Sequence, residues 1–138
     1  MAAIAFTGTI SWDFIDVENR NIIAGEDIAA NQVVYYDPTT GKALKASANT
    51  TGKKTPRGIA LDTVKAGQPV TVVRRGEIAG PILSGNFGTL VYLADTAGGL
   101  DTVASATTTV PVGYVVPDSK RVPEKALFVD FTGLTIYG

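Results

Sequence analysis

The sequence contains neither cysteine nor histidine, and this absence removes several kinds of chemistry at once. Disulfides, thiolate nucleophiles, imidazole general bases and the usual zinc sites all need one of these two residues. Catalysis would have to rest on carboxylates, Lys, Tyr, Ser or Thr. The sequence therefore predicts a protein that is not an enzyme and that holds no cofactor and no metal ion.

An excess of one charge is also lacking, since 12 Lys and Arg residues stand against 13 Asp and Glu residues. Nucleic acids and anionic membranes both require a basic surface, so we expect neither as a partner. No stretch has the length and apolarity of a membrane span, and the first residues lack the pattern of a secretory signal. Apolar residues make up 45% of the 138 residues, which is enough for one domain with a buried core.

Alternating side chains are the main secondary-structure signal. From Ile4 to Phe14, every second residue is apolar or glycine, which predicts a half-buried strand with these residues on one face. Turns rich in Gly, Pro and Asp separate the later segments, including one turn at Arg75-Gly76. Further strands are expected from their Val, Ile, Thr and aromatic content over residues 32–36, 43–46, 55–61, 69–75, 90–93, 102–104, 112–116 and 126–131. The predicted fold is all-β, a small barrel or sandwich of short strands with extended terminal segments.

Two halves of the chain resemble each other at an offset of roughly 55–58 residues. One such unit is too small to bury its own apolar face, so two units are expected to pack together. We predict an N-terminal strand-like arm over residues 1–21 and a β domain over 22–138, with the two similar units at about 30–75 and 87–131. The matching segments are 32–36 with 89–93, 56–61 with 111–116, and 70–73 with 126–129.

The charged and aromatic residues leave several interpretations open. Asp13 and Asp16 belong to an acidic patch whose spacing fits neither a glycosidase pair nor a calcium loop. Arg74 and Arg75 indicate either a solvated strand face or ion pairing with an acidic partner. Trp12, the single tryptophan, is either a core residue or an interface anchor.

Several segments together resemble the small capsid cement, or head decoration, proteins of tailed bacteriophages. They are AGEDIAANQVVYYD at 24–37, GIALD at 58–62 and AGQPVTVVRRG at 66–76, followed by a second copy at 88–93 and 112–116. The resemblance covers about residues 22–131. It implies a non-enzymatic virion protein, made in the host cytoplasm, that binds the outer surface of the head, often as a homotrimer. Its partner would be the major capsid protein, whose neighbouring subunits it would hold together.

Both ends of the chain carry alternating apolar and aromatic residues, which favours docking in a groove or addition of a strand to a neighbour. An alternative is a receptor- or carbohydrate-binding β-module of a phage fibre or spike, in which Tyr35, Tyr36 and Tyr92 stack on sugars. The predicted protein interface consists of Ile4, Phe6, Ile10, Trp12, Phe14, Arg74, Arg75, Leu134, Ile136 and Tyr137.

Overall fold

Nine strands and no helix are found among the residues that the computed structural model describes, which are 4–6, 10–18, 21–80, 83, 85–118, 120 and 124–132. The predicted all-β class is therefore confirmed, and within these ranges no helix has the length and apolarity to cross a membrane. The strands are β1 (Ser11–Glu18), β2 (Val33–Tyr36), β3 (Ala43–Lys45), β4 (Gly58–Ala60), β5 (Val72–Ala79), β6 (Leu90–Leu93), β7 (Leu100–Asp101), β8 (Pro111–Pro117) and β9 (Lys125–Asp130).

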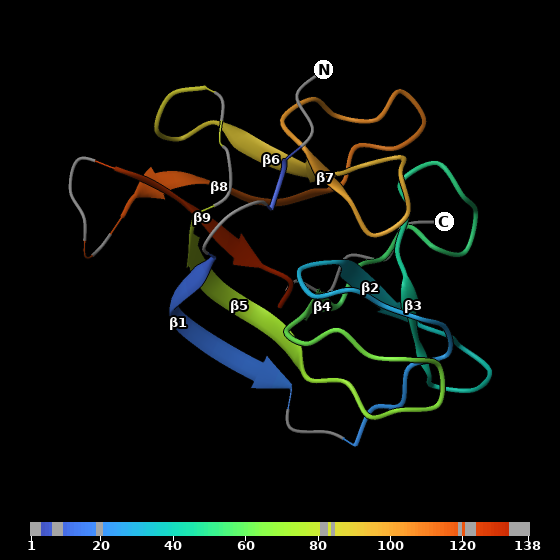
Figure 1. Cartoon of the computed structure of the whole chain (residues 1–138). Coiled ribbons are helices and arrows are strands. Elements are labelled where there is room, and N and C mark those ends of the chain that lie inside the picture. The colour runs from blue at the N-terminus through green and yellow to red at the C-terminus, as the bar shows by residue number, and fades with distance from the viewer. Residues whose placement is uncertain are drawn as a thin grey trace.

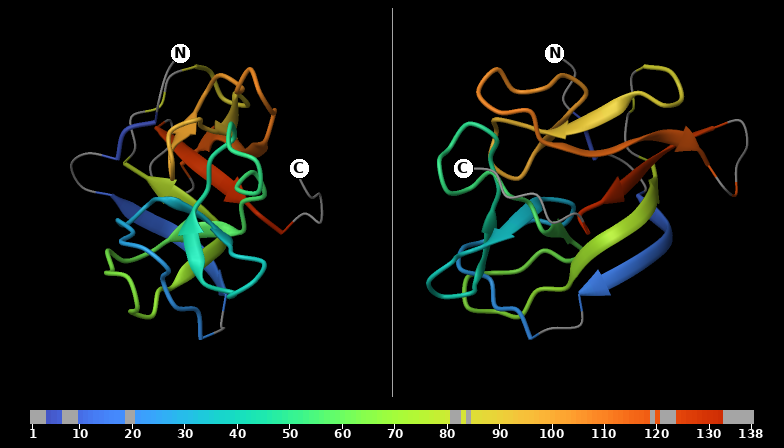
Figure 2. Two further views of the ribbon diagram at one scale, coloured as in Figure 1. Left: turned by 90° about the vertical axis from the view of Figure 1, so that its right-hand side faces the viewer. Right: turned by 180° about the vertical axis from the view of Figure 1, so that it is seen from behind.

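The strands form one antiparallel sheet in the order β3-β2-β4-β5-β9-β8-β6-β7, and β1 pairs with β5 outside this path. The sheet curls strongly into a half-barrel (Figures 1 and 2). Strand β1 pairs with β5 along the whole length of β5. Strands β4 and β9 each pair with a different part of β5. The N-terminal strand is therefore joined to the sheet through β5.

Both halves of the sheet have the same strand order, since β3-β2-β4-β5 in one half matches β7-β6-β8-β9 in the other. Aligned glycines also occupy equivalent places. A Cβ atom on Gly58 in β4 would lie 2.6 Å from the carbonyl oxygen of Val73, and one on Gly113 in β8 would overlap the carbonyl oxygen of Phe128. This order is what a repeated unit would produce, while a common origin of the two halves stays a prediction.

Hydrogen bonds join the two halves a second time, at their hairpin ends. The Val33 amide donates to the Gly98 carbonyl at 2.9 Å, and the Gly98 amide donates to the Ala46 carbonyl at 2.8 Å. The Ala48 amide donates to the Ala94 carbonyl at 3.0 Å. Gly98 has a φ of +79°, in the left-handed region that favours glycine. The curl of the sheet is therefore fixed both at the β5–β9 pair and at this contact between loops.

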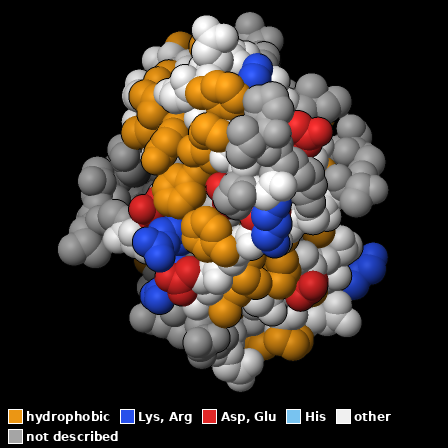
Figure 3. Space-filling model, turned by 90° about the vertical axis from the view of Figure 1, so that its left-hand side faces the viewer, with side chains coloured by type: hydrophobic (Ala, Val, Ile, Leu, Met, Phe, Trp, Pro, Cys, Tyr) orange, Lys and Arg blue, Asp and Glu red, His pale blue; other side chains and the backbone are white. Residues whose placement is uncertain are grey.

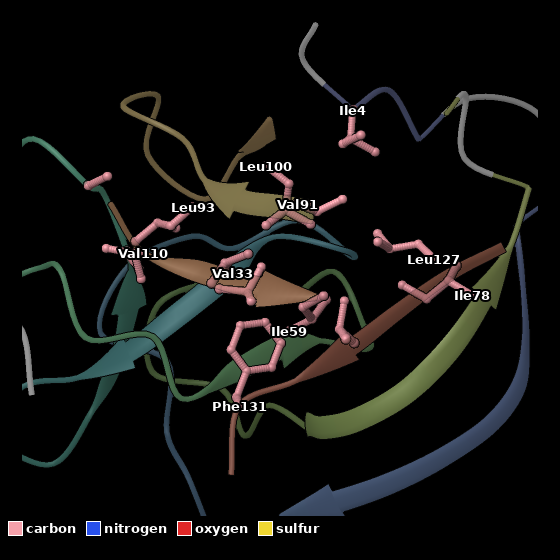
Figure 4. Close-up of a cluster of buried hydrophobic side chains, with 14 of the residues drawn as sticks. Ile4, Val33, Ile59, Ile78, Val91, Leu93, Leu100, Val110, Leu127 and Phe131 are labelled. Carbon is pink, nitrogen blue, oxygen red and sulfur yellow. The ribbon is translucent and has the colours of Figure 1, made fainter. Parts of the chain in front are cut away.

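The larger core cluster is built from both halves (Figure 4). Val33 and Ile59 from the first half pack in one cluster with Val91 and Leu127 from the second. Ile78 of β5 belongs to the same cluster. Burial of side chains of this kind contributes about 1.5–3 kcal/mol each. A smaller cluster lies within the first half and consists of Ile22, Ala24, Ile28, Val34, Ala43, Ala60, Val70 and Val72. Neither half alone contains the larger cluster.

The N-terminal strand differs from the prediction at one decisive point. A register shift places Asp13 in a bulge, so that Trp12 lies opposite Ile78 while Phe14 lies opposite Glu77. Because Ile78 and Glu77 are consecutive, their side chains point to opposite faces of the sheet. Trp12 consequently packs against the core and Phe14 is turned outward, so the prediction that they share one face is wrong.

Two further predictions from the sequence are wrong. Arg75-Gly76 is not a turn, because both residues lie inside β5. A Cβ atom on Gly76 would lie 2.7 Å from the carbonyl oxygen of Phe14 and 2.9 Å from Cζ3 of Trp12, so this glycine lets β1 approach β5 closely. The strand expected over 102–104 occurs earlier, as β7.

Candidate functional site

Four apolar side chains line up across the outer face of the sheet. Phe14 of β1, Phe128 of β9, Tyr114 of β8 and Leu90 of β6 are linked by register, with Glu77 of β5 between the first two. Residues at matching register positions share a face. We call Phe14, Phe128, Tyr114 and Leu90 the aromatic row.

The aromatic row is open to solvent over much of its length. Phe14, Tyr114 and Leu90 are 43%, 42% and 47% exposed, and Phe128 is half-buried between its neighbours. Its ring centroid lies 6.3 Å from that of Phe14 and 5.5 Å from that of Tyr114, which is aromatic packing distance. Figure 3 shows hydrophobic side chains gathered in a band on this side of the molecule. Such a band is typical of a surface that another molecule covers.

Three carboxyl groups meet beside the aromatic row, and we call Asp13, Glu77 and Asp118 the carboxyl cluster. They come from the β1 bulge, from β5 and from the residue after β8, and one carboxyl oxygen from each lies within 4.8 Å of the other two. All three are buried: the Asp13 side chain is 2% exposed, and Glu77 and Asp118 are 7% and 1% exposed. Glu77 belongs to the cluster and also sits between Phe14 and Phe128, so the two features meet at this residue.

Burial raises the pKa of Asp13 from its ordinary 3.8 to about 6, and hydrogen bonds and negative charge from Glu77 and Asp118 act in the same direction. Carboxyl groups this close cannot all ionise without a cost, because like charges repel. Nζ of Lys120, an exposed side chain, lies 4.0 Å from Oδ1 of Asp13 and offsets part of the charge. At mildly acidic pH the Asp13 carboxyl group is therefore partly protonated, and its proton can be donated to a neighbouring carboxylate.

The Asp118 carboxylate also shapes the segment that follows β8. Its Oδ1 accepts a hydrogen bond from the Lys120 amide at 2.8 Å, and the Asp118 amide donates to the Glu124 carbonyl at 2.8 Å. These bonds fix the Lys120 backbone beside Asp118 and join Asp118 to Glu124, the residue before β9. The backbone of Lys120, whose side chain approaches Asp13, is therefore held in place by the Asp118 carboxylate.

A cavity of about 470 Å³ lies elsewhere, beside the β6–β7 hairpin. Its lining includes Ile4, Leu100 and Val103, and it does not include the three clustered carboxyl groups. The acidic residues that line this cavity are Asp95 and Asp101, so the carboxyl cluster and the cavity are separate features of the molecule.

The structure places the predicted apolar interface residues differently from one another. Ile4 is buried in the larger core cluster, and Phe6, Ile10 and Trp12 pack against that cluster, so these four side chains dock on the protein's own core. Phe14 is exposed and forms one end of the aromatic row. Leu134, Ile136 and Tyr137 lie outside the described residues.

The two predicted arginines lie on β5, beside β1. Nη2 of Arg74 lies 3.1 Å from Oδ1 of Asp16, so part of its charge is engaged within the chain. Arg75 is exposed and lies opposite Asp16 on one side and Asp130 on the other. An exposed ion pair such as Arg74–Asp16 contributes about 0–1 kcal/mol, so its effect on the stability of the protein is small.

Sequence reasoning did not identify most members of the row or the cluster. Phe128, Tyr114 and Leu90 lie on strands that the sequence predicts, but their shared face depends on strand order and register. Glu77 and Asp118 lie outside the acidic patch that the sequence indicates. The one available signal was Glu77 itself, a charged residue in an otherwise apolar stretch that follows Gly76.

The tyrosines of the alternative interpretation lie mostly against the protein. Tyr35 is buried in the larger core cluster, and Tyr36 packs against the smaller one. Tyr92 of β6 is half-buried. Tyr35 and Tyr36 therefore leave little ring surface open, whereas a ring that stacks on a sugar must present an open face.

Comparisons with protein-family models, with curated proteins and with solved structures found no match to this chain. The all-β fold and the geometry of the aromatic row therefore stand on the structure alone.

Proposed function

We propose that this protein is a non-enzymatic cement, or decoration, protein of a tailed-bacteriophage virion. It binds the outer surface of the head and holds neighbouring subunits of the major capsid protein together. The virion assignment rests on the resemblance of residues 22–131 to such proteins. The observation that carries the binding role is the exposed aromatic row, because it offers a rigid apolar surface on a sheet.

Physical arguments support a binding role for the aromatic row. A few residues supply most of the binding energy at protein interfaces, and Tyr is enriched among them. The row sits on paired strands, so little order has to be gained when a partner docks. Its apolar surface would be covered by a capsid subunit, with Arg75 and Asp130 at its side as polar contacts.

Charge balance and symmetry fit the same role. A formal net charge of −1 allows many copies to pack densely on a shell without strong mutual repulsion. Many weak contacts on a symmetric shell add up to tight attachment, and a homotrimer would attach through three copies of the contact at once. The protein would be made in the host cytoplasm and end on the outer capsid surface.

Sedimentation with decoration-free heads tests this function. Purified protein is mixed with the heads, the heads are sedimented, and the bound protein is measured over a range of concentrations. We expect saturable binding, and we expect Tyr114→Ser and Leu90→Ser each to weaken it about 30-fold, which corresponds to the roughly 2 kcal/mol of a central interface residue.

Val103→Ser is the matched control. Val103 is 52% exposed but lies after β7 and outside the aromatic row, so its replacement removes apolar surface without touching the proposed contact. Heads that bind no wild-type protein would refute the decoration role. Wild-type binding that neither row variant weakens would instead refute the row as the contact surface.

A further inference from the structure

The carboxyl cluster joins three separate parts of the chain at the point where β1 bends. Asp13 lies at the register shift of β1, Glu77 lies in β5, and Asp118 begins the connection from β8 to β9. Strand β1 is attached to the sheet through β5. Contacts made by the Asp13 side chain therefore help to decide whether the first half of β1 stays paired with the sheet.

We propose that Asp13, Glu77 and Asp118 form a proton-operated latch that holds β1 on the sheet at acidic pH and loosens it as the pH rises. When Asp13 is protonated, its carboxyl group forms hydrogen bonds with the Glu77 and Asp118 side chains. When the proton leaves, an additional negative charge remains within 4.8 Å of the other two carboxyl groups. Because these groups lie on different elements, the repulsion pushes β1 away from β5 and from the end of β8.

Among the residues that the structure describes, the other charged groups near the latch do not cancel this repulsion. On β1, Asp16 is held by Arg74 of β5 at 3.1 Å. In the β8–β9 connection, Lys120 approaches Asp13 to only 4.0 Å and is 60% exposed, so solvent screens its charge.

The remaining charged side chains that the structure describes on these elements lie toward other neighbours. Arg75 of β5 is exposed and lies opposite Asp130 of β9. Glu124 is exposed, and Nζ of Lys125 donates to the Gly85 carbonyl at 2.6 Å. Among the described residues, Lys120 is therefore the cation that directly offsets the negative charge of ionised Asp13.

The position of the cluster decides which part of the protein responds. Asp13 lies between Trp12, which packs on the core, and Phe14, which ends the aromatic row. The ladder is already interrupted there by the bulge, so little pairing has to break for the first half of β1 to lift. The raised pKa of Asp13, about 6, places the response between mildly acidic and neutral pH. This device does not depend on what binds the aromatic row.

Trp12 supplies the readout because it is the only tryptophan in the chain and is adjacent to Asp13. Acrylamide quenching of its fluorescence measures how often solvent reaches the ring. For the full-length wild type, we expect the quenching constant to rise about twofold between about pH 4.5 and pH 7.5, with a midpoint near pH 6. Circular dichroism over the same range should show that the rest of the sheet stays folded.

Three variants separate the latch from a general effect of pH. Asp13→Asn imitates the protonated group, so its quenching should stay low throughout. Glu77→Gln removes one of the negative charges, so the midpoint should move to lower pH. Asp16→Asn is the control on the same strand and should keep the wild-type midpoint. Quenching in the wild type that does not change with pH, or an unchanged transition in Asp13→Asn, would overturn the proposal.

Discussion

The tight contact between β8 and β9 yields a prediction whose size follows from the structure. Gly113 lies in an extended strand, where alanine is normally favoured over glycine by about 0.5–1 kcal/mol. A Cβ atom there would overlap the carbonyl oxygen of Phe128 and lie 3.1 Å from the Cα atom of Val129. Both obstacles are main chain, so no side-chain rotation relieves the clash. We therefore expect Gly113→Ala to destabilise the protein.

The magnitude combines strain with lost pairing. Overpacking costs about 1–3 kcal/mol, and each weakened hydrogen bond of the β8–β9 ladder costs about 1 kcal/mol more. We expect a loss of about 3–4 kcal/mol for Gly113→Ala, against about 5–15 kcal/mol of total stability in a domain of this kind. Gly58→Ala should cost about 2–3 kcal/mol, because a Cβ atom there would meet Val72 and lie 2.6 Å from the Val73 carbonyl oxygen.

Urea unfolding, followed by Trp12 fluorescence and by circular dichroism, measures these losses. Gly67→Ala is the control, since Gly67 has a φ of +89° and a Cβ atom added there would meet no other part of the protein within 4 Å. It should cost only the roughly 1–2 kcal/mol of an unfavourable backbone angle. If Gly113→Ala destabilises the protein no more than Gly67→Ala does, the close approach of β8 and β9 is not a determinant of stability.

Three further predictions concern β1 and one hairpin. Gly76→Ala should cost about 1–3 kcal/mol and reduce hydrogen-exchange protection in β1 but not in β9, because the new methyl group meets Trp12. Asp13→Asn should stabilise the protein at pH 7 by about 1–2 kcal/mol, allowing for solvent screening, in urea unfolding. The pKa of Asp13 is raised from 3.8 to about 6 in the folded protein. The stability that its protonated form contributes is therefore fully present below pH 3.8 and lost as the pH rises through 6. The extra stability of Asp13→Asn over the wild type should accordingly disappear at low pH. The hydrogen bond that the Thr39 amide donates to Asp37 lowers the pKa of the Asp37 carboxyl group. Asp37→Ala should therefore loosen the β2–β3 turn at neutral pH, and its difference from wild type in thermal unfolding should shrink as the pH falls below 3.8.

Much of the fold follows from local properties of the chain. Alternating apolar residues, β-branched side chains and Gly- or Pro-containing turns predicted strands close to β2, β3, β4, β6, β8 and β9. These signals depend on neighbouring residues, so they can be read without knowledge of the tertiary structure. The failures occur where a distant element intervenes. Arg75-Gly76 has the composition of a turn, but pairing with β1 and β9 keeps it extended.

The candidate site shows the same division. Phe14 was recognised as an interface residue from its place in an alternating run, but its outward direction results from the bulge at Asp13. Nothing in the local sequence of Asp118 indicates that its carboxyl group will meet Asp13. Their proximity requires β1 and the end of β8 to lie together around β5 and β9, which is a property of strand order.

The sequence by itself determined the all-β class, the approximate strands and the lack of thiol and imidazole chemistry, because side-chain types and their local spacing act over a few residues. Only the tertiary structure decided which residues share the outer face and which acids are buried together. A β-strand exposes its two faces alternately, so a single bulge or a change of register exchanges them. Burial of Asp13, and hence its raised pKa, depends on atoms contributed by segments far away in the chain.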